Sequence, residues 1–477
     1  MSVTKTGVAS GTVSRATILR ILIGLFLGYG YFNTMRGVFP QQMRSIAKEM
    51  DVPLERIGLP NSMFSASYGI GKFFTSLASD YVPCSEFHAL GLMLSGVAVA
   101  ALGFCPGFGA LAVLWGLQGI VQAFGWPFVG RIVVTKLPAA DRAKYWGLLS
   151  MACNVGNMLA PYGIVAAGAV GLSWRGSFIA AGVSAVVVSA IVWWLLCCGS
   201  AGALQSIETI PESSAAEGED DLKKAKKHED DSKPKMSSWA GSLAMLSLMG
   251  CNMLSFGSSK CIKEWAPVYL RNTGLASSEL EVATLIFWSE VGGSAGAVAG
   301  GFVSSRLGGR HSLTCVLSAL IASSSLGTLL WCCWASALDP ARAAPMSFPV
   351  ACALQALALA GVNGVRTLAG LHGAELAAFL GRRVGATNAW LEAVGQIGSV
   401  CAGQPLGALA AFAVSTLVAH SSFFIPPSSS GQTGLDSPIA GTTIIGVLTI
   451  ASVIMVMLNV ALLPQEALRL SHKAKVE

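Results

Sequence analysis

The residues best suited to chemistry in this chain are a few basic side chains that interrupt long apolar runs. Residues 125–131 (Gly-Trp-Pro-Phe-Val-Gly-Arg) place Arg131 at the end of an apolar stretch, and Arg36, Lys260 and Arg366 also stand within largely apolar sequence. A cation is costly in hydrocarbon, so a basic residue there usually has a function. Guanidinium and ammonium groups bind anions, and phosphate above all suits the paired donors of arginine.

The elements that carry these cations are predicted to be membrane-spanning helices. The chain has 477 residues, of which 53% are hydrophobic and 12% charged, with a mean hydropathy of +0.62. A soluble domain has about 25% charged residues. The apolar residues fall in blocks long enough to cross a bilayer, which takes about 20 residues of helix. Twelve spans are predicted, near residues 18–39, 57–80, 87–105, 109–134, 143–167, 176–198, 241–270, 279–303, 311–334, 347–372, 384–413 and 439–463.

One polar segment divides these spans into two sets of six. Residues 199–238 mix acidic, basic, Ser and Pro residues and cannot bury a core, so they are predicted to form a linker. The organisation is therefore an all-α membrane protein with two six-helix halves, a pattern that resembles the major facilitator transporters. Its expected parts are a cytoplasmic tail (1–17), an N-terminal bundle (18–198), the cytoplasmic linker (199–238), a C-terminal bundle (239–465) and a second cytoplasmic tail (466–477).

The distribution of basic residues predicts the orientation. Lys and Arg are concentrated in the N-terminal tail, the even-numbered loops, the linker and the C-terminal tail, whereas the loops after the third and eleventh spans have none. The positive-inside rule then places both termini in the cytoplasm. The first outer loop, which contains Arg44, Lys48 and Arg56, is an exception. The endoplasmic reticulum, another internal membrane and the plasma membrane all stay open as locations.

Other classes of function find little support in the sequence. The 12 cysteines stand mostly in apolar runs and form neither a metal-binding nor a disulfide pattern. We find no nucleotide-binding loop and no catalytic triad in a suitable context. The prediction is a protein that is not an enzyme, has no cofactor and no metal, binds the lipid bilayer rather than nucleic acid, and acts as a monomer.

Several short motifs occur together in a fixed order. They lie at residues 31–33 (Tyr-Phe-Asn), 65–73, 125–131, 154–156 (Asn-Val-Gly), 173–175 (Ser-Trp-Arg), 289–293 and 370–376. In this order they resemble the organophosphate:phosphate antiporters of the major facilitator superfamily. The resemblance implies a membrane antiporter that exchanges a phosphorylated sugar or other organophosphate, such as glucose-6-phosphate, for inorganic phosphate by alternating access.

The resemblance also implies which cations bind phosphate, since in this family one basic residue on helix 1 faces another on helix 7. Arg36 is the helix 1 candidate, although it lies two positions beyond the place that the family uses. Lys260 is the helix 7 candidate, five positions before Trp265. Two other interpretations stay open: in one, Arg36 extends to the outer headgroups, and in the other, Lys263 forms an interfacial ion pair with Glu264.

Further residues are candidates for the substrate cavity. Tyr31, Tyr68 and Asn154 offer hydrogen bonds and stacking surfaces to a phosphosugar, although such residues often serve ordinary packing. Arg366 is either a third cation of the site or the partner of a buried acid, Glu290 or Glu392. Both acids are expected to balance buried cations, with proton coupling as the weaker alternative.

Four residues are expected at the cavity mouth or in gating. Lys72 and Asp80 belong to residues 71–80, which resemble the superfamily motif after helix 2. Arg131 either attracts anions to the mouth or anchors lipid headgroups. His372 serves either gating or packing. Two rival functions also stay open, namely a facilitator for another organic anion and a sensor that binds sugar phosphate without transporting it.

Overall fold

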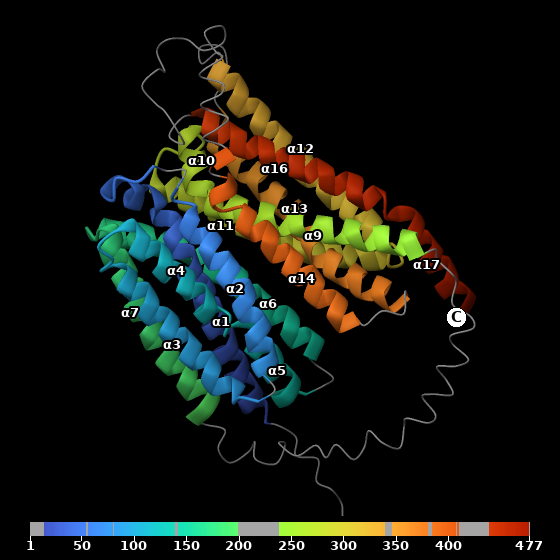
Figure 1. Cartoon of the computed structure of the whole chain (residues 1–477), viewed down its shortest axis with the longest axis horizontal. Coiled ribbons are helices and arrows are strands. Elements are labelled where there is room, and N and C mark those ends of the chain that lie inside the picture. The colour runs from blue at the N-terminus through green and yellow to red at the C-terminus, as the bar shows by residue number, and fades with distance from the viewer. Residues whose placement is uncertain are drawn as a thin grey trace, which may run out of the picture.

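The structure, a computed structural model, describes residues 14–53, 56–79, 81–138, 142–198, 238–338, 346–379, 384–406, 408–409 and 438–476. Helices and short connections make up these ranges, without a strand among them. Figure 1 shows two helical bundles side by side, the first coloured blue to green and the second yellow-green to red. Asp80, nearly all of the predicted linker and the first 13 residues lie outside the described residues.

The first bundle contains eight helical elements. These are α1 (Arg15–Glu49), α2 (Leu59–Ala78), α3 (Cys84–Leu102), α4 (Phe108–Gln122), α5 (Trp126–Lys136), α6 (Arg142–Ala169), α7 (Trp174–Trp193) and the π-helical turn η2 (Trp194–Cys198).

The described part of the second bundle contains another eight. These are α9 (Ser238–Glu264), α10 (Ala266–Asn272), α11 (Glu279–Arg306), α12 (His311–Leu338), α13 (Phe348–Phe379), α14 (Val384–Cys401), α16 (Pro438–Val460) and α17 (Leu463–Val476).

The first helix is longer than the sequence predicted. The predicted span ends at residue 39, before Pro40, but α1 continues through the proline to Glu49. Proline removes one helical hydrogen bond, here the one to the carbonyl of Arg36, and costs about 3 kcal/mol or more inside a helix. Burial offsets this cost, because Met43 and Ile46 beyond the proline are fully buried in the same apolar cluster as Trp265 of the second bundle. The predicted outer loop therefore begins ten residues later than expected.

Two predicted spans are each broken into two helices. The span at 109–134 divides into α4 and α5 at Gly125, and Pro127 stands in the first turn of α5. The span at 241–270 divides into α9 and α10 at Trp265, followed by Pro267 in the first turn of α10. In both places proline lacks the N–H that a continuous helix would need, and it fits the first turn of a new helix.

Within the described residues, eight helical segments are long and apolar enough to cross a membrane, judged by length and composition alone. They are Arg15–Glu49, Cys84–Leu102, Phe108–Val133, Trp174–Cys197, Glu279–Arg306, His311–Ala335, Phe348–Gly373 and Thr442–Ala467. Helices also lie at the other four predicted positions, in α2, α6, α9 with α10, and α14. Three of these four positions carry the charged residues described below, which lowers their hydropathy. The total of twelve crossings stays a prediction.

Glycine allows some helices to touch backbone to backbone. A Cβ atom at Gly292 or Gly296 of α11 would lie 2.2 Å or 2.1 Å from a carbonyl oxygen of α13, and one at Gly156 of α6 would lie 2.0 Å from that of Gly30 on α1. No larger residue fits at such distances. Small residues at these positions therefore permit close helix packing.

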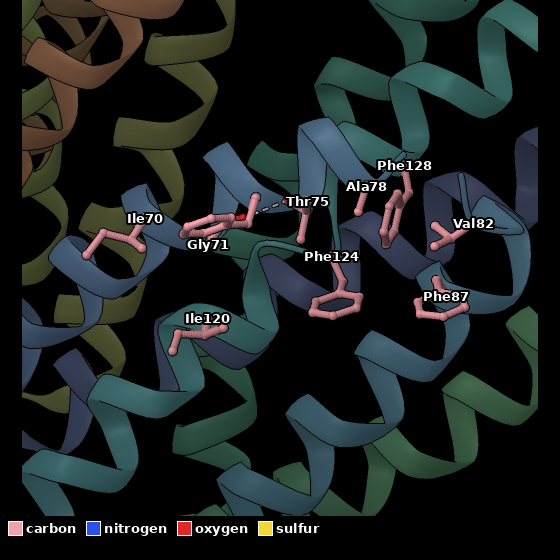
Figure 2. A pocket seen from close by; sticks show the side chains of 10 residues that line it. Ile70, Gly71, Thr75, Ala78, Val82, Phe87, Ile120, Phe124 and Phe128 are labelled. Atoms are coloured by element: carbon pink, nitrogen blue, oxygen red, sulfur yellow. Dashed lines mark hydrogen bonds between the residues drawn. The ribbon is translucent and has the colours of Figure 1, made fainter. Parts of the chain in front are cut away.

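A hollow of about 400 Å³ opens on the flank of the first bundle, between α2, α4 and the start of α5. Figure 2 shows its apolar lining, to which Phe74, Phe87, Phe124 and Phe128 contribute rings. The hydroxyl of Thr75, at its edge, donates to the carbonyl of Gly71 at 2.9 Å. Because no charged side chain lines this hollow, it is unsuited to phosphate, and the anion chemistry must be sought between the two bundles.

Candidate functional site

The centre of the candidate site is an aromatic face on α2. Phe64, Tyr68 and Lys72 follow one another at intervals of four residues, which places them on one side of the helix. The two rings are stacked, with centroids 6.0 Å apart and planes 13° from parallel. The guanidinium carbon of Arg36 lies 4.5 Å from the Tyr68 ring centre and 5.5 Å from that of Phe64. Lys260 approaches the Phe64 ring at 5.3 Å. Cations from three helices therefore meet at two aromatic rings.

Arg36 is held by neutral groups. Its Nη2 donates to Oε1 of Gln122 at 3.4 Å, and the Nε2 of this amide donates to the hydroxyl of Ser95 at 3.0 Å. The Nε of Arg36 is buried and has no hydrogen-bond partner among the described residues. Within the same ranges no carboxylate forms an ion pair with Arg36. Its charge is therefore available to a bound anion, and the interpretation of Arg36 as a headgroup anchor does not fit this position.

Lys260 joins the two bundles and already has an acidic partner. Its Nζ lies 2.5 Å from the hydroxyl of Ser65 on α2 and 3.0 Å from Oε1 of Glu264, one turn along α9. Only 14% of the Lys260 side chain and 9% of that of Glu264 are exposed. The predicted helix 1 and helix 7 cations thus both lie beside the Phe64 ring. They differ because Lys260 has an acidic partner, whereas Arg36 has none among the described residues.

The other two acids also pair with lysines, although Glu290 is buried and Glu392 is partly exposed. Glu392 on α14 lies 2.5 Å from Nζ of Lys72, which ties α2 to α14 across the bundles. Glu290 on α11 lies 2.8 Å from Nζ of Lys263. The suggested pair of Lys263 with Glu264 is wrong, because these neighbouring residues on α9 point to different partners.

Arg366 lies on α13, with its guanidinium carbon 4.1 Å from the centre of the Phe256 ring on α9. Its side chain is exposed, and its charge acts on Glu392 of α14 and on Tyr29 of α1 in the other bundle. Of the two acids suggested as partners of Arg366, Glu290 forms an ion pair with Lys263 instead. Glu392 forms an ion pair with Lys72, and the positive charge of Arg366 also acts on it.

The bundles are held together along α2 and α14. The hydroxyl of Ser62 donates to the carbonyl of Val400 at 2.9 Å and accepts from the backbone N–H of Gln404 at 2.8 Å. Further along α2, Lys72 contacts Glu392. Because the order of contacts is reversed between the two helices, they run antiparallel, and the cation cluster lies beside this seam.

Comparison with known proteins places this architecture in a family. A model of the Major Facilitator Superfamily matches residues 21–403. The chain belongs to this superfamily. The transporter is similar in structure to a bacterial homolog of the human lysosomal transporter Spinster in an inward-facing, unoccupied conformation, with a TM-score of 0.62 over 95% of this chain and 99% of the other. At 16% identity this likeness shows the shared fold alone.

Relatives within the superfamily fit the predicted branch of organophosphate:phosphate antiporters. The transporter is 29% identical over 317 residues to the membrane sensor protein UhpC of Salmonella typhimurium, covering 65% of this chain and 69% of that protein. It is 26% identical over 294 residues to the glucose-6-phosphate exchanger SLC37A2 of Bos taurus, covering 56% and 59%.

Two predicted cavity residues take part in or lie beside polar contacts within the first bundle of this transporter. The hydroxyl of Tyr31 donates to that of Ser184 on α7 at 2.7 Å, a contact within the first bundle. Asn154 is half-buried on α6 beside Cys153, whose thiol contacts the amide oxygen of Asn33 at 3.2 Å. Tyr68 is thus the predicted polar aromatic residue that joins the cation cluster.

The residues predicted for the mouth or for gating fall in different places. Lys72 lies in the bridge between the bundles, and Asp80 is outside the described residues. Arg131 is exposed on α5, and its role at the mouth stays a prediction. His372 is buried at 2% exposure, with Nδ1 3.3 Å from the hydroxyl of Ser312 on α12, so it contributes to a junction within the second bundle.

Three site residues escaped the sequence analysis as members of the site. Phe64 precedes Tyr68 by four residues and Lys72 by eight, so helical spacing alone gave a signal for it. Gln122 gave none, because an amide in an apolar helix has many ordinary uses. Glu264 was seen only as the neighbour of Lys263, and its actual partner Lys260 is one helical turn away.

Proposed function

We propose that this transporter is an antiporter that exchanges an organophosphate, such as a phosphorylated sugar, for inorganic phosphate by alternating access of the two bundles. The observation that carries this proposal is Arg36, a half-buried guanidinium whose Nε is buried without a hydrogen-bond partner and which has no carboxylate partner in the described ranges. A phosphoryl group suits such a site, because charge-assisted hydrogen bonds to guanidinium are strong and can form in pairs.

The charge of the cluster supports a dianionic substrate. Four basic side chains and two acidic ones meet here, and four minus two leaves two positive charges; they are Arg36, Lys72, Lys260 and Arg366 with Glu264 and Glu392. The two acids pair with the two lysines, so the two uncompensated charges are guanidinium groups. A phosphate monoester carries nearly two negative charges near neutral pH.

In this proposal Arg36 and Lys260 bind the phosphoryl group of the organophosphate and inorganic phosphate alternately. The rings of Tyr68 and Phe64 flank the bound molecule. Exposed Arg366 adds a cation from α13. Lys72 and Glu392 belong to the contact that must open when the bundles rock to the other side. The protein acts as a monomer with both termini in the cytoplasm, in an internal membrane or the plasma membrane.

A second candidate function is a sensor that binds sugar phosphate without moving it. The similarity to a protein named as a membrane sensor favours this alternative over an unrelated activity. A transporter of another organic anion would use the same cations, since carboxylates also bind arginine and lysine.

Exchange in liposomes separates these functions. The full-length protein is reconstituted into vesicles loaded with inorganic phosphate, and uptake of labelled glucose-6-phosphate, glycerol-3-phosphate and succinate is measured. Phosphate exchange predicts uptake of an organophosphate that needs internal phosphate and fails in vesicles loaded with chloride. Uptake of succinate alone would contradict the proposal, and binding of glucose-6-phosphate without any uptake would favour the sensor.

A further inference from the structure

Glu264 lies where the helix itself does not favour an acid. It is the last residue of α9, and a carboxylate there meets the partial negative charge at the C-terminal end of the helix dipole. Its partner Lys260 precedes it by four residues, which is the weaker of the two orders for a lysine–glutamate pair on a helix. The stability of the helix by itself therefore does not explain why a glutamate stands at position 264.

The surroundings of Glu264 are those of a bound anion. Oε1 contacts Lys260 at 3.0 Å, and the charges of Arg36 and Lys263 also act on the carboxylate. Oε2 is buried and has no hydrogen-bond partner in the described part of the chain. A buried acceptor without a partner is unusual in folded proteins and calls for an explanation other than packing.

We propose that Glu264 is a tethered anion that occupies Lys260 when no substrate is bound, and that the phosphoryl group of the substrate must displace it. This inference rests on the proposed function, because it concerns the same cations. Glu264 keeps binding weak enough for release, since each incoming anion competes with a carboxylate on the same helix at high effective concentration. A last observation in its favour is that Lys260, unlike Arg36, has a carboxylate partner among the described residues.

The competition also selects substrates by charge. A singly charged carboxylate resembles Glu264 itself and has no advantage over a group already in place. A dianionic phosphoryl group attracts Lys260 and Arg36 more strongly, so it displaces the glutamate. Glu264 therefore acts as a specificity residue that excludes simple organic acids from a site whose cations would otherwise accept them.

Glu290 provides a matched control within the same half. It also pairs with a lysine of α9, is 1% exposed, and has its two oxygens 2.8 Å and 3.1 Å from Nζ of Lys263. Its Oε1, like Oε2 of Glu264, is buried without a hydrogen bond among the described residues, so the two acids differ mainly in their position. Its pair links α9 to α11 inside the second bundle. Replacement of Glu290 should lower stability without strengthening the binding of any anion.

The test is calorimetric binding of inorganic phosphate, glucose-6-phosphate and gluconate to the full-length protein and to its Glu264→Gln and Glu290→Gln variants. We expect Glu264→Gln to bind inorganic phosphate at least about tenfold more tightly, since close charge pairs at binding sites are often coupled by more than the free energy of a tenfold change. We also expect measurable binding of gluconate and slower phosphate exchange in vesicles. Unchanged or weaker phosphate binding by Glu264→Gln would overturn the inference.

A double-mutant cycle distinguishes displacement from simple repulsion. If Glu264 forms its ion pair with Lys260 in the substrate-free protein, the Glu264→Gln replacement strengthens phosphate binding more in the wild-type background than in the Lys260→Gln background. An equal gain in both backgrounds would mean that Glu264 repels the substrate without occupying Lys260, and would contradict the proposal. Glu264→Asp, which retains the charge on a shorter side chain, should give intermediate affinity and serves if the glutamine variant does not fold.

These results stay separate from the test of the proposed function. If the wild-type protein binds neither phosphate nor glucose-6-phosphate and exchanges neither, the proposed function itself fails. If the wild type binds and exchanges them but Glu264→Gln behaves like Glu290→Gln, only the role of Glu264 fails.

Discussion

The two halves of this transporter contribute different chemistry to the space between them. The first half presents Arg36 against stacked aromatic rings with a neutral amide as its partner. The second half presents lysines that each have their own acid, Lys260 with Glu264 and Lys263 with Glu290. The two bundles thus contribute differently: the first offers the unpaired guanidinium of Arg36 beside aromatic rings, whereas the second combines lysines that already have an acid with the exposed guanidinium of Arg366.

This difference suggests how a site can be strong and still release its ligand. An unbalanced guanidinium gives affinity, because a bound anion satisfies its charge and its free donor. A lysine with a competing carboxylate adds less net attraction, because each anion that enters replaces another. Affinity should therefore depend mainly on the first half, and discrimination between anions mainly on the second.

The largest expected effect comes from the first half. Arg36→Ala should lower phosphate counterflow in reconstituted vesicles at least about thirtyfold, because loss of one partner of a buried charge interaction typically costs about 2–5 kcal/mol. Arg306→Ala is the control, since Arg306 is an exposed residue at the end of α11 that stacks on Phe302. Exchange at the wild-type rate by Arg36→Ala would rule out its assigned role.

Removal of the Lys260–Glu264 pair as a neutral unit should have a smaller effect. The double variant Lys260→Gln/Glu264→Gln is expected to lose about tenfold or less in phosphate exchange, because the wild-type pair carries no net charge. A loss as large as that of Arg36→Ala would show that the two halves contribute equally, and the comparison drawn here would be wrong.

The bridge between the halves should have an effect of similar or lesser size. Lys72→Glu and Glu392→Lys are each expected to lower exchange about tenfold, and their combination should recover much of it by restoring the pair in reverse. The loss is limited because 43% of the Glu392 side chain is exposed, where solvent screens the interaction. Failure of the combined variant to exceed either single variant would argue against the bridge.

The smallest effect is expected within the first half, away from the cations. Tyr31→Phe removes the hydrogen bond to Ser184 and should lower the free energy of unfolding by about 0.5–1.5 kcal/mol, with exchange changed less than about twofold. Thermal unfolding in detergent measures the first quantity and vesicle assays the second. Tyr81→Phe, at an exposed tyrosine, should change neither. A large loss of exchange in Tyr31→Phe would instead indicate that Tyr31 contributes to the substrate cavity.

The positions of the helices followed from the sequence with few errors. Long apolar blocks signal helices in lipid, and proline with glycine marked the region near Gly125 where the fourth span breaks. The end of α1 was predicted wrongly, because the rule that proline ends a helix acts locally. The burial of Met43 against residues more than two hundred positions away decides the outcome instead.

The charges of the site divide in the same way. By itself the sequence determined that Arg36, Lys260 and Arg366 are exceptional, since an isolated cation in an apolar run is visible without any neighbour. Only the tertiary structure decided which charges meet: Lys72 and Glu392 are 320 positions apart, and Glu264 turns to Lys260 rather than to adjacent Lys263. Pairing depends on the rotation of each helix about its axis and on distances of a few ångströms, because electrostatic and hydrogen-bond energies fall away over that range.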